Sequence, residues 1–175
     1  MKKFKLTSEF IVDISGVKLF RIKALIEFGN VKAGDLGGYI EKEENLSHMG
    51  DAWVSDDARI SGNAQVFGNA QVFGDAWVFG NARVFGNARV FGDAQVFGDA
   101  RVSGDKDYAY AHGFGSCNRT TTFFRLKDGD VGVRCGCFYG TLAQFRDKVC
   151  ETHGETKKAQ EYLMLADLME IRFKN

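Results

Sequence analysis

The chain of 175 residues has no proline, no net charge and no long apolar segment. Its 23 basic side chains balance 23 acidic ones, which excludes a general nucleic-acid coat, because phosphate binding needs a basic surplus. No apolar run is long enough to span a membrane. No apolar signal-peptide core follows the basic residues 1–5. We therefore expect a cytoplasmic protein that binds neither membranes nor nucleic acids in general.

Cysteine is scarce and confined to the last third of the chain, at Cys117, Cys135, Cys137 and Cys150. In a reducing compartment these residues are expected to be thiols rather than disulfides. Cys135 and Cys137 lie two positions apart, so both sulfurs could reach one metal ion from the same side of a strand. The spacing is not the paired Cys-x-x-Cys of a zinc ribbon. We predict small buried thiols and no bound metal or other cofactor.

Glycine and phenylalanine are abundant, at 21 and 16 residues, because a six-residue unit recurs from Gly50 to Ser103. The unit reads Gly-Asn/Asp-Ala-x-Val-x. All nine copies keep the alanine and a β-branched residue two positions later, and only Asp56 replaces the leading glycine. Alternation of Ala and Val with variable residues is typical of a strand with one buried face. Gly before Asn or Asp suits a tight corner, so the repeat predicts a coil with Ala and Val inside.

Written from the valine, residues 84–89 read Val-Phe-Gly-Asn-Ala-Arg and resemble the hexapeptide repeat of left-handed parallel β-helices. The resemblance implies triangular coils of three hexads each. We therefore predict a mainly β protein with a three-coil left-handed parallel β-helix at residues 50–104. An N-terminal β cap and lead-in would occupy residues 1–49, and a small C-terminal ββαα unit, a hairpin plus two helices, residues 105–175.

Local signals support the flanking elements. The first region has a hairpin turn at residues 15–16 between two alternating segments. Near the C-terminus, residues 120–126 and 131–135 are expected to pair as a second hairpin. A capping box opens a helix over residues 141–152, and apolar residues at helical spacing predict another helix over residues 155–173.

Positions 18 residues apart should stack in successive coils. The residues before the valines then form the columns Trp53/Gln71/Arg89, Arg59/Trp77/Gln95 and Gln65/Arg83/Arg101. The residues after the valines place six phenylalanines outside, at Phe67, Phe73, Phe79, Phe85, Phe91 and Phe97. We interpret these as aromatic ladders within the chain, or as a subunit or partner interface; both can hold. The corner column Asp57/Asp75/Asp93 indicates solvated turn residues, with a hard cation as the alternative.

Tryptophan and arginine are the residue types that anchor interfaces. The candidate binding residues are therefore Trp53, Arg59, Trp77, Arg83, Arg89 and Arg101. They could engage a protein surface, or stack on and neutralise a nucleotide. Many enzymes with this repeat transfer acyl groups from acyl-coenzyme A with a histidine base. The hexads contain no histidine, and His48 and His112 lie outside them, where cap and loop roles are expected.

The cap, the hexads and the tail sequence Cys-Gly-Cys-Phe-Tyr-Gly at residues 135–140 together resemble uncharacterised β-helical proteins carried by phages and prophages of gut bacteria. This resemblance implies a non-enzymatic inhibitor of a bacterial defence system. Such an inhibitor would bind a host protein, for example a CRISPR nuclease, or sequester a nucleotide signal. An acyltransferase and a structural scaffold component are the alternatives. The enzymes with this repeat imply a homo-oligomer, a trimer or a dimer.

Overall fold

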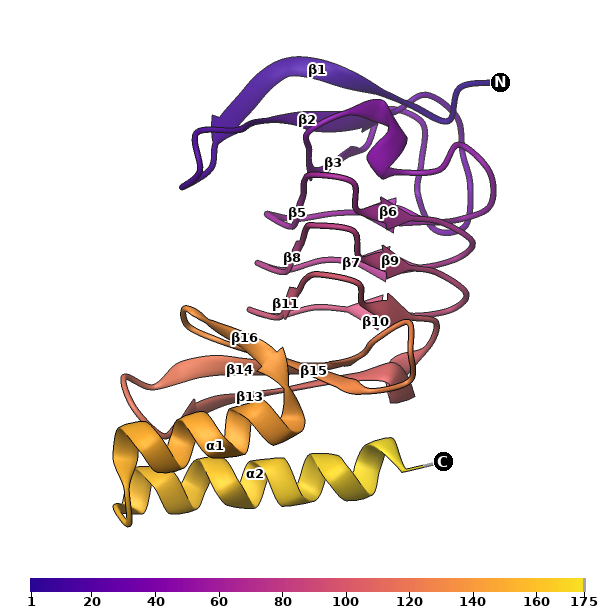
Figure 1. The fold of residues 1–175 in the computed structure, drawn as a ribbon. Helices are drawn as coiled ribbons and strands as arrows, with labels where there is room; N and C mark the ends of the chain where they lie inside the picture. The colour runs from indigo at the N-terminus through magenta and orange to yellow at the C-terminus, as the bar shows by residue number, and fades with distance from the viewer. Residues whose placement is uncertain (175) are drawn as a thin grey trace.

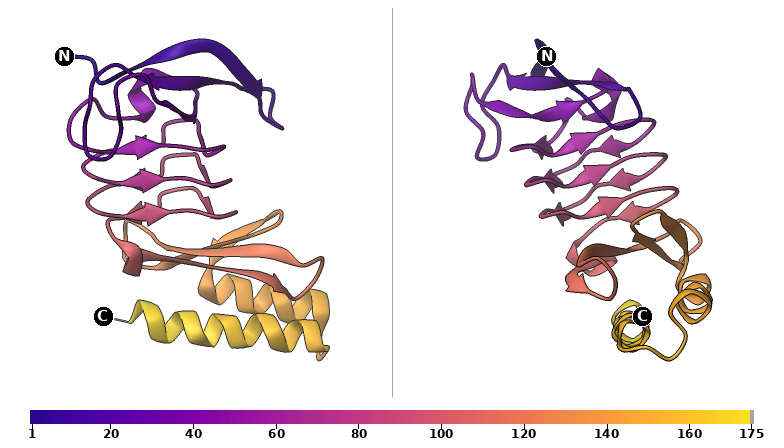
Figure 2. Two further views of the ribbon diagram at one scale, coloured as in Figure 1. Left: turned by 180° about the vertical axis from the view of Figure 1, so that it is seen from behind. Right: turned by 90° about the vertical axis from the view of Figure 1, so that its left-hand side faces the viewer.

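A computed structural model describes residues 1–174 of the chain. Its middle part is a stack of parallel coils, with strands above and a sheet with two helices below (Figures 1 and 2). Each hexad contributes one short strand. The nine strands are β4 (Trp53–Val54), β5 (Arg59–Ile60), β6 (Gln65–Val66), β7 (Gln71–Val72), β8 (Trp77–Val78), β9 (Arg83–Val84), β10 (Arg89–Val90), β11 (Gln95–Val96) and β12 (Arg101–Val102). The predicted mainly β architecture built on a coil is confirmed.

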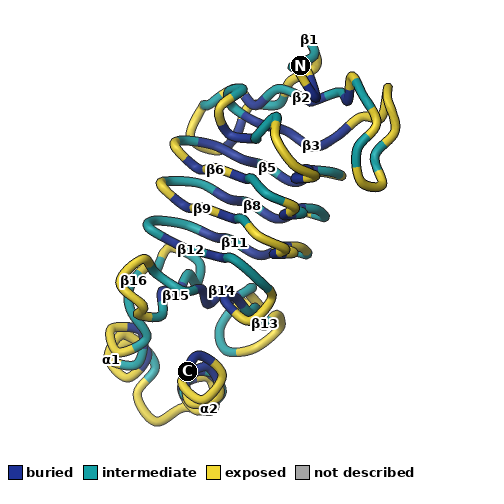
Figure 3. Tube along the Cα trace, turned by 90° about the vertical axis from the view of Figure 1, so that its right-hand side faces the viewer, coloured by how far each residue is buried: buried dark blue, intermediate teal, exposed yellow. Residues whose placement is uncertain are grey.

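The strands of successive coils pair in parallel, as β4-β7-β10, β5-β8-β11 and β6-β9-β12. Partners are 18 residues apart, as the repeat predicts. Every hexad alanine and every β-branched residue is buried, with at most 1% exposure. Figure 3 shows these buried segments alternating with exposed corners. The corners need glycine: Gly68 has a φ of +71°, and a Cβ there would lie 3.0 Å from the Gly86 nitrogen.

The N-terminal region continues one of the three stacks. β1 (Phe4–Val12) and β2 (Lys18–Ala24) form an antiparallel hairpin, with its turn at the predicted residues 15–16. β3 (Leu36–Ile40) pairs with β2 on one side and in parallel with β5 on the other. The result is a six-stranded sheet in the order β1-β2-β3-β5-β8-β11. The β cap is therefore joined to the coils by backbone hydrogen bonds.

The lead-in also adds a partial coil above the three predicted ones. Tyr39 is the register partner of Arg59, and Leu46 bridges to Val66 in parallel. Leu46 is buried, as its place in an imperfect tenth hexad predicts, whereas His48 is only half-buried. The solenoid thus has about four turns, because two extra residues in the lead-in do not prevent the stacking.

Side-chain donors cover the upper end of the stack. The Lys3 ammonium donates to the carbonyls of Gly50 and Ala52, at 3.1 and 2.7 Å. The Asn45 amide, in the short helix η1 (Glu43–Asn45), donates to the Ala64 carbonyl at 2.8 Å. In the lower coils the corresponding carbonyls accept backbone N–H groups of the coil above. These side chains therefore replace a missing coil and block continued pairing at this edge.

Side-chain acceptors cover the lower end. Asp105, in the short helix η2 (Asp105–Asp107), accepts a hydrogen bond from the Arg89 N–H at 3.1 Å. Thr122 Oγ1 accepts one from the Gln95 N–H at 3.0 Å. Both ends of the stack are thus satisfied by side chains of the flanking segments.

The C-terminal unit is a four-stranded antiparallel sheet followed by two helices. Its elements are β13 (Tyr108–Phe114), β14 (Arg119–Arg125), β15 (Val131–Cys135), β16 (Phe138–Thr141), α1 (Leu142–His153) and α2 (Lys157–Phe173). The hairpin β14-β15 and both helices are confirmed, including the capping box at Thr141. The ββαα description is wrong by two strands, because β13 and β16 pair only through the tertiary arrangement of the hairpin. None of the helices within residues 1–174 is long and apolar enough to cross a membrane.

This sheet separates two cores. Phe124 and Tyr108 pack against the lowest coil, whereas Phe123 faces the helices together with Phe145 and Tyr162. The helices lie side by side on the sheet face that points away from the coils (Figures 1 and 2). Neighbouring residues of β14 thus face opposite cores, as the alternation of a strand requires.

Candidate binding surface and groove

The coils display their variable residues in rows, one on each of three faces. The strand register confirms the predicted columns. We name the faces by their first residue: the Trp53 face (β4, β7, β10), the Arg59 face (β5, β8, β11) and the Gln65 face (β6, β9, β12). The six candidate binding residues are spread in pairs over these faces, so the structure does not gather them into one site.

Trp53 does not point to solvent as expected. Its side chain is only 4% exposed, and its ring meets the edge of Phe28 at a centroid distance of 5.3 Å. The lead-in before β3 covers this ring, a contact with no local sequence signal. Trp53 is therefore a core residue and is not available to a partner.

The six phenylalanines form ladders within the chain, as predicted. Each upper ring stacks on the ring one coil below, at centroid distances of 5.2 Å for Phe67–Phe85, 5.2 Å for Phe73–Phe91 and 4.4 Å for Phe79–Phe97. Phe91 is 39% exposed and the other five are half-buried. Stacking thus covers most of the apolar area of these rings, and their use as a subunit interface stays a prediction.

The four hexad arginines have no carboxylate partner within ion-pair distance among residues 1–174. By contrast, Arg146 in α1 pairs with two carboxylates of α2. Arg83 and Arg89 instead lie over phenylalanine rings, at 4.9 and 5.5 Å from the centroids. The Nε atom of Arg59 is buried and has no hydrogen-bond partner. Only Arg101 is held by the backbone, where it donates to the Asn81 carbonyl at 3.1 Å.

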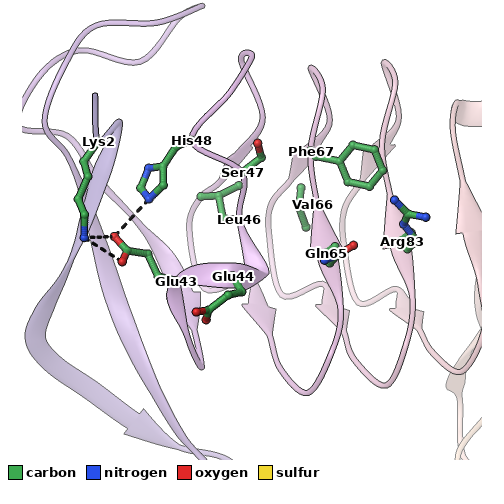
Figure 4. Close-up of a pocket in the computed structure, with 10 residues that line it drawn as sticks. All are labelled: Lys2, Glu43, Glu44, Leu46, Ser47, His48, Gln65, Val66, Phe67 and Arg83. Atoms are coloured by element: carbon green, nitrogen blue, oxygen red, sulfur yellow. Dashed lines mark hydrogen bonds and ion pairs between the residues drawn. The ribbon is translucent and has the colours of Figure 1, made fainter.

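A groove of about 560 Å³ opens at the top of the Gln65 face, between η1 and β9 (Figure 4). We call it the Phe67 groove. Its lining residues are Lys2, Glu43, Glu44, Leu46, Ser47, His48, Gln65, Val66, Phe67 and Arg83. Asn45 precedes the bridging Leu46 but turns its side chain inward to cap the coil. No outward side chain therefore stands above Gln65, and this leaves the hollow.

One wall of the Phe67 groove is a fixed polar cluster. The Lys2 ammonium donates to both carboxylate oxygens of Glu43, at 2.8 and 2.9 Å, and holds the pKa of that carboxyl below its usual value. The Lys3 N–H donates to His48 Nδ1 at 3.1 Å, so Nε2 carries the ring proton and donates to Glu43 at 3.2 Å. The His48 ring also stacks on Phe4. Both nitrogens are engaged, which fits the predicted cap role.

His112 lies at the opposite end of the stack, on β13. It is exposed, and its Nδ1 atom is 2.9 Å from Thr120 Oγ1 and 3.9 Å from an Asp93 oxygen. The expected loop histidine is thus on a strand. It shares no groove with His48.

A second groove of about 510 Å³ opens on the Trp53 face; we call it the Phe73 groove. It contains the same three residue types as the Phe67 groove, here Gln71, Phe73 and Arg89, but two aspartates, Asp51 and Asp56, also line it. Both grooves were missed by the sequence analysis. The available signal was the serine that ends each phenylalanine column, which leaves the uppermost ring without an aromatic neighbour above.

The cysteines and corner aspartates do not form a metal site. No three His, Cys, Asp or Glu side chains within the described part of the chain could hold one ion. Cys135 lies on β15 near Tyr162, while Cys137 follows Gly136 in the turn to β16. Asp56 accepts a hydrogen bond from the Gly74 N–H at 3.0 Å and so supports its corner. All four thiols are free, but burial was predicted wrongly for the exposed Cys117, Cys137 and Cys150.

Residues 82–95 and 94–105 match the model of the YdcK beta solenoid repeat family. The match covers a small part of the hexad region, so it shows a likeness in the repeat and no more. No curated protein matches the chain.

Proposed function

We propose that this protein is a non-enzymatic binding protein whose solenoid arginines recognise an acidic partner. The observation that carries the proposal is the set of four hexad arginines without a carboxylate partner among residues 1–174. A guanidinium presents several donors in a fixed fork that matches carboxylates. A stacked coil holds these groups at fixed spacing, so little order has to be gained on binding.

The Arg59 face is the best anchor for a protein surface. Trp77 stacks on Phe79 at 4.5 Å and donates its indole N–H to Ser61 at 3.3 Å, so the ring is already oriented. Arg59 is its register neighbour one coil above. A rigid aromatic ring beside an unpaired guanidinium is a typical pair of interface anchors.

The resemblance to phage and prophage proteins favours a host protein as the partner. We propose that the chain acts in the cytoplasm of the bacterial host and inhibits a defence system, for example by binding a CRISPR nuclease. A homo-oligomer, trimeric or dimeric, belongs to this proposal, because it would repeat the arginine faces. The engaged nitrogens of His48 support a binding role over acyl transfer, and the scaffold role would leave the arginines without a purpose.

The test is capture of host protein from bacterial lysate by two charge-matched variants. One variant changes the four hexad arginines to glutamine. The other changes four exposed lysines outside the coils to glutamine: Lys5, Lys106, Lys157 and Lys158. We expect an acidic host protein to be retained by the wild type and the lysine variant, to be lost with the arginine variant, and to dissociate at high salt. Equal capture by both variants would refute the proposal, as would a wild type that retains no protein.

A further inference from the structure

We infer that the Phe67 groove binds a nucleoside monophosphate, with the base stacked on Phe67 and the phosphate held by Arg83. This site does not rest on the protein partner proposed above, because it uses a different face of the coils. It gives a location to the nucleotide that the sequence analysis left open.

The stacking surface comes from an incomplete ladder. Phe67 lies on Phe85 with a centroid distance of 5.2 Å and an angle of 5° between the ring planes. Leu46 is the partner of Val66, so Ser47 occupies the ladder position above Phe67. Its hydroxyl accepts the Met49 N–H at 3.0 Å and supplies no ring. A flat aromatic base can therefore continue the ladder on the open side of Phe67, and every nucleobase has a face suited to such stacking.

The anion partner lies beside this ring. The guanidinium carbon of Arg83 is 4.9 Å from the Phe67 centroid, and the side chain is exposed and forms no ion pair among residues 1–174. A phosphate joined to a stacked base through a ribose is close enough to accept the guanidinium fork. Figure 4 shows Arg83 and Phe67 together on one side of the groove and Lys2, Glu43 and His48 on the other.

The remaining groups suit the ribose and the edge of the base. Gln65 is exposed and offers an amide that both donates and accepts. The Glu43 charge is balanced by Lys2, which leaves Glu44 as the one carboxylate in the lining without that balance, suited to accept ribose hydroxyl groups. The volume of about 560 Å³ falls within the range of small-molecule sites.

The Phe73 groove is a built-in control. Phe73 stacks on Phe91 at the same 5.2 Å, and Arg89 lies over it at 5.5 Å. There, however, Asp51 and Asp56 line the groove and repel a phosphate. The Gln71 amide is also occupied, because it donates to the Asp51 carbonyl at 2.9 Å.

The test is calorimetric titration of the purified full chain with AMP, adenosine and inorganic phosphate. The variants exchange residues that the repeat itself uses at these positions, so the coil should fold: Phe67→Ser and Arg83→Gln in the site, Phe73→Ser and Arg89→Gln in the control groove. We expect saturable AMP binding that is at least about tenfold tighter than binding of adenosine or phosphate. Each site variant should weaken it at least about tenfold, and the control variants should change it less than about twofold.

Three results would overturn the inference: no saturable AMP binding at millimolar ligand, equal losses in the two grooves, or adenosine binding as tightly as AMP. An unphosphorylated oligoadenylate strand that binds more tightly than AMP would also overturn it, because it would indicate a nucleic-acid strand. Circular dichroism of each variant checks the fold. Failure of this test leaves the capture experiment unaffected, since that experiment depends on all four arginines and on a host protein.

Discussion

Replacing Asn45 with alanine should destabilise the upper end of the solenoid. The Asn45 side chain is fully buried. Its amide donates to the carbonyls of Gly62 and Ala64 at 3.1 and 2.8 Å, and its oxygen accepts the Lys42 N–H at 2.9 Å. The substitution leaves these three backbone groups without a side-chain partner at a position where a further coil would otherwise cover them.

The magnitude follows from the number of groups. An unsatisfied buried polar group costs about 1–3 kcal/mol, and the neighbouring Phe67 groove admits water to part of this region. We therefore take the lower value for each group and expect a loss of about 3 kcal/mol in the free energy of unfolding. Asn63→Ala is the matched control. Its side chain is exposed and bonds Asn81 at 3.3 Å, so its loss should stay below about 0.5 kcal/mol.

The assay is urea denaturation of both variants, followed by tryptophan fluorescence. Trp53 lies in the uppermost full coil and is 4% exposed, so it reports on this end directly. Hydrogen exchange of the β3 and β5 amides should increase in the Asn45 variant if the end opens locally. A loss below about 1 kcal/mol, or one no larger than that of Asn63→Ala, would contradict the capping argument.

Other predictions concern the corners, the core and pH. Gly68→Ala should cost at least about 2 kcal/mol in denaturation experiments, because the residue combines a φ of +71° with a backbone contact at 3.0 Å; Gly104→Ala, with open space around it, should cost no more than about 0.5 kcal/mol. Val78→Ala should lower stability by about 2 kcal/mol, since the side chain is fully buried, and an unchanged urea midpoint would refute this. Burial lowers the pKa of Lys3 from 10.5 to about 8, so between these values the unfolded state binds more protons and stability should rise with pH. Lys3→Met should abolish that rise between pH 8 and 10, below the range where Tyr108, with its pKa raised to about 12 by burial, acts in the opposite direction.

The predictable part of the fold depends on short-range patterns. The strand register of 18 residues follows from the hexads alone, because each corner restricts the backbone and each Ala and Val has one buried direction. The N-terminal hairpin and the capping box at Thr141 are likewise encoded within a few residues. β13 and β16 were missed because their pairing depends on a sheet whose centre is the β14-β15 hairpin.

The candidate site was less predictable because it depends on the lead-in. The hexads place Arg83 and Phe67 outward, and the structure agrees. They cannot indicate that Phe28 covers Trp53, or that Asn45 turns inward and leaves a hollow above Gln65.

The sequence by itself determined the coil, its period and which residues face outward, since these properties repeat with every hexad and need only nearest-neighbour stacking. The tertiary structure decided which outward residues remain accessible. That outcome is set where the repeat ends, because the terminal coils have no neighbouring coil and their backbone groups must be met by side chains from segments far away in the chain. The Phe67 groove arises at such an end, where Asn45 caps the backbone instead of extending the outer row.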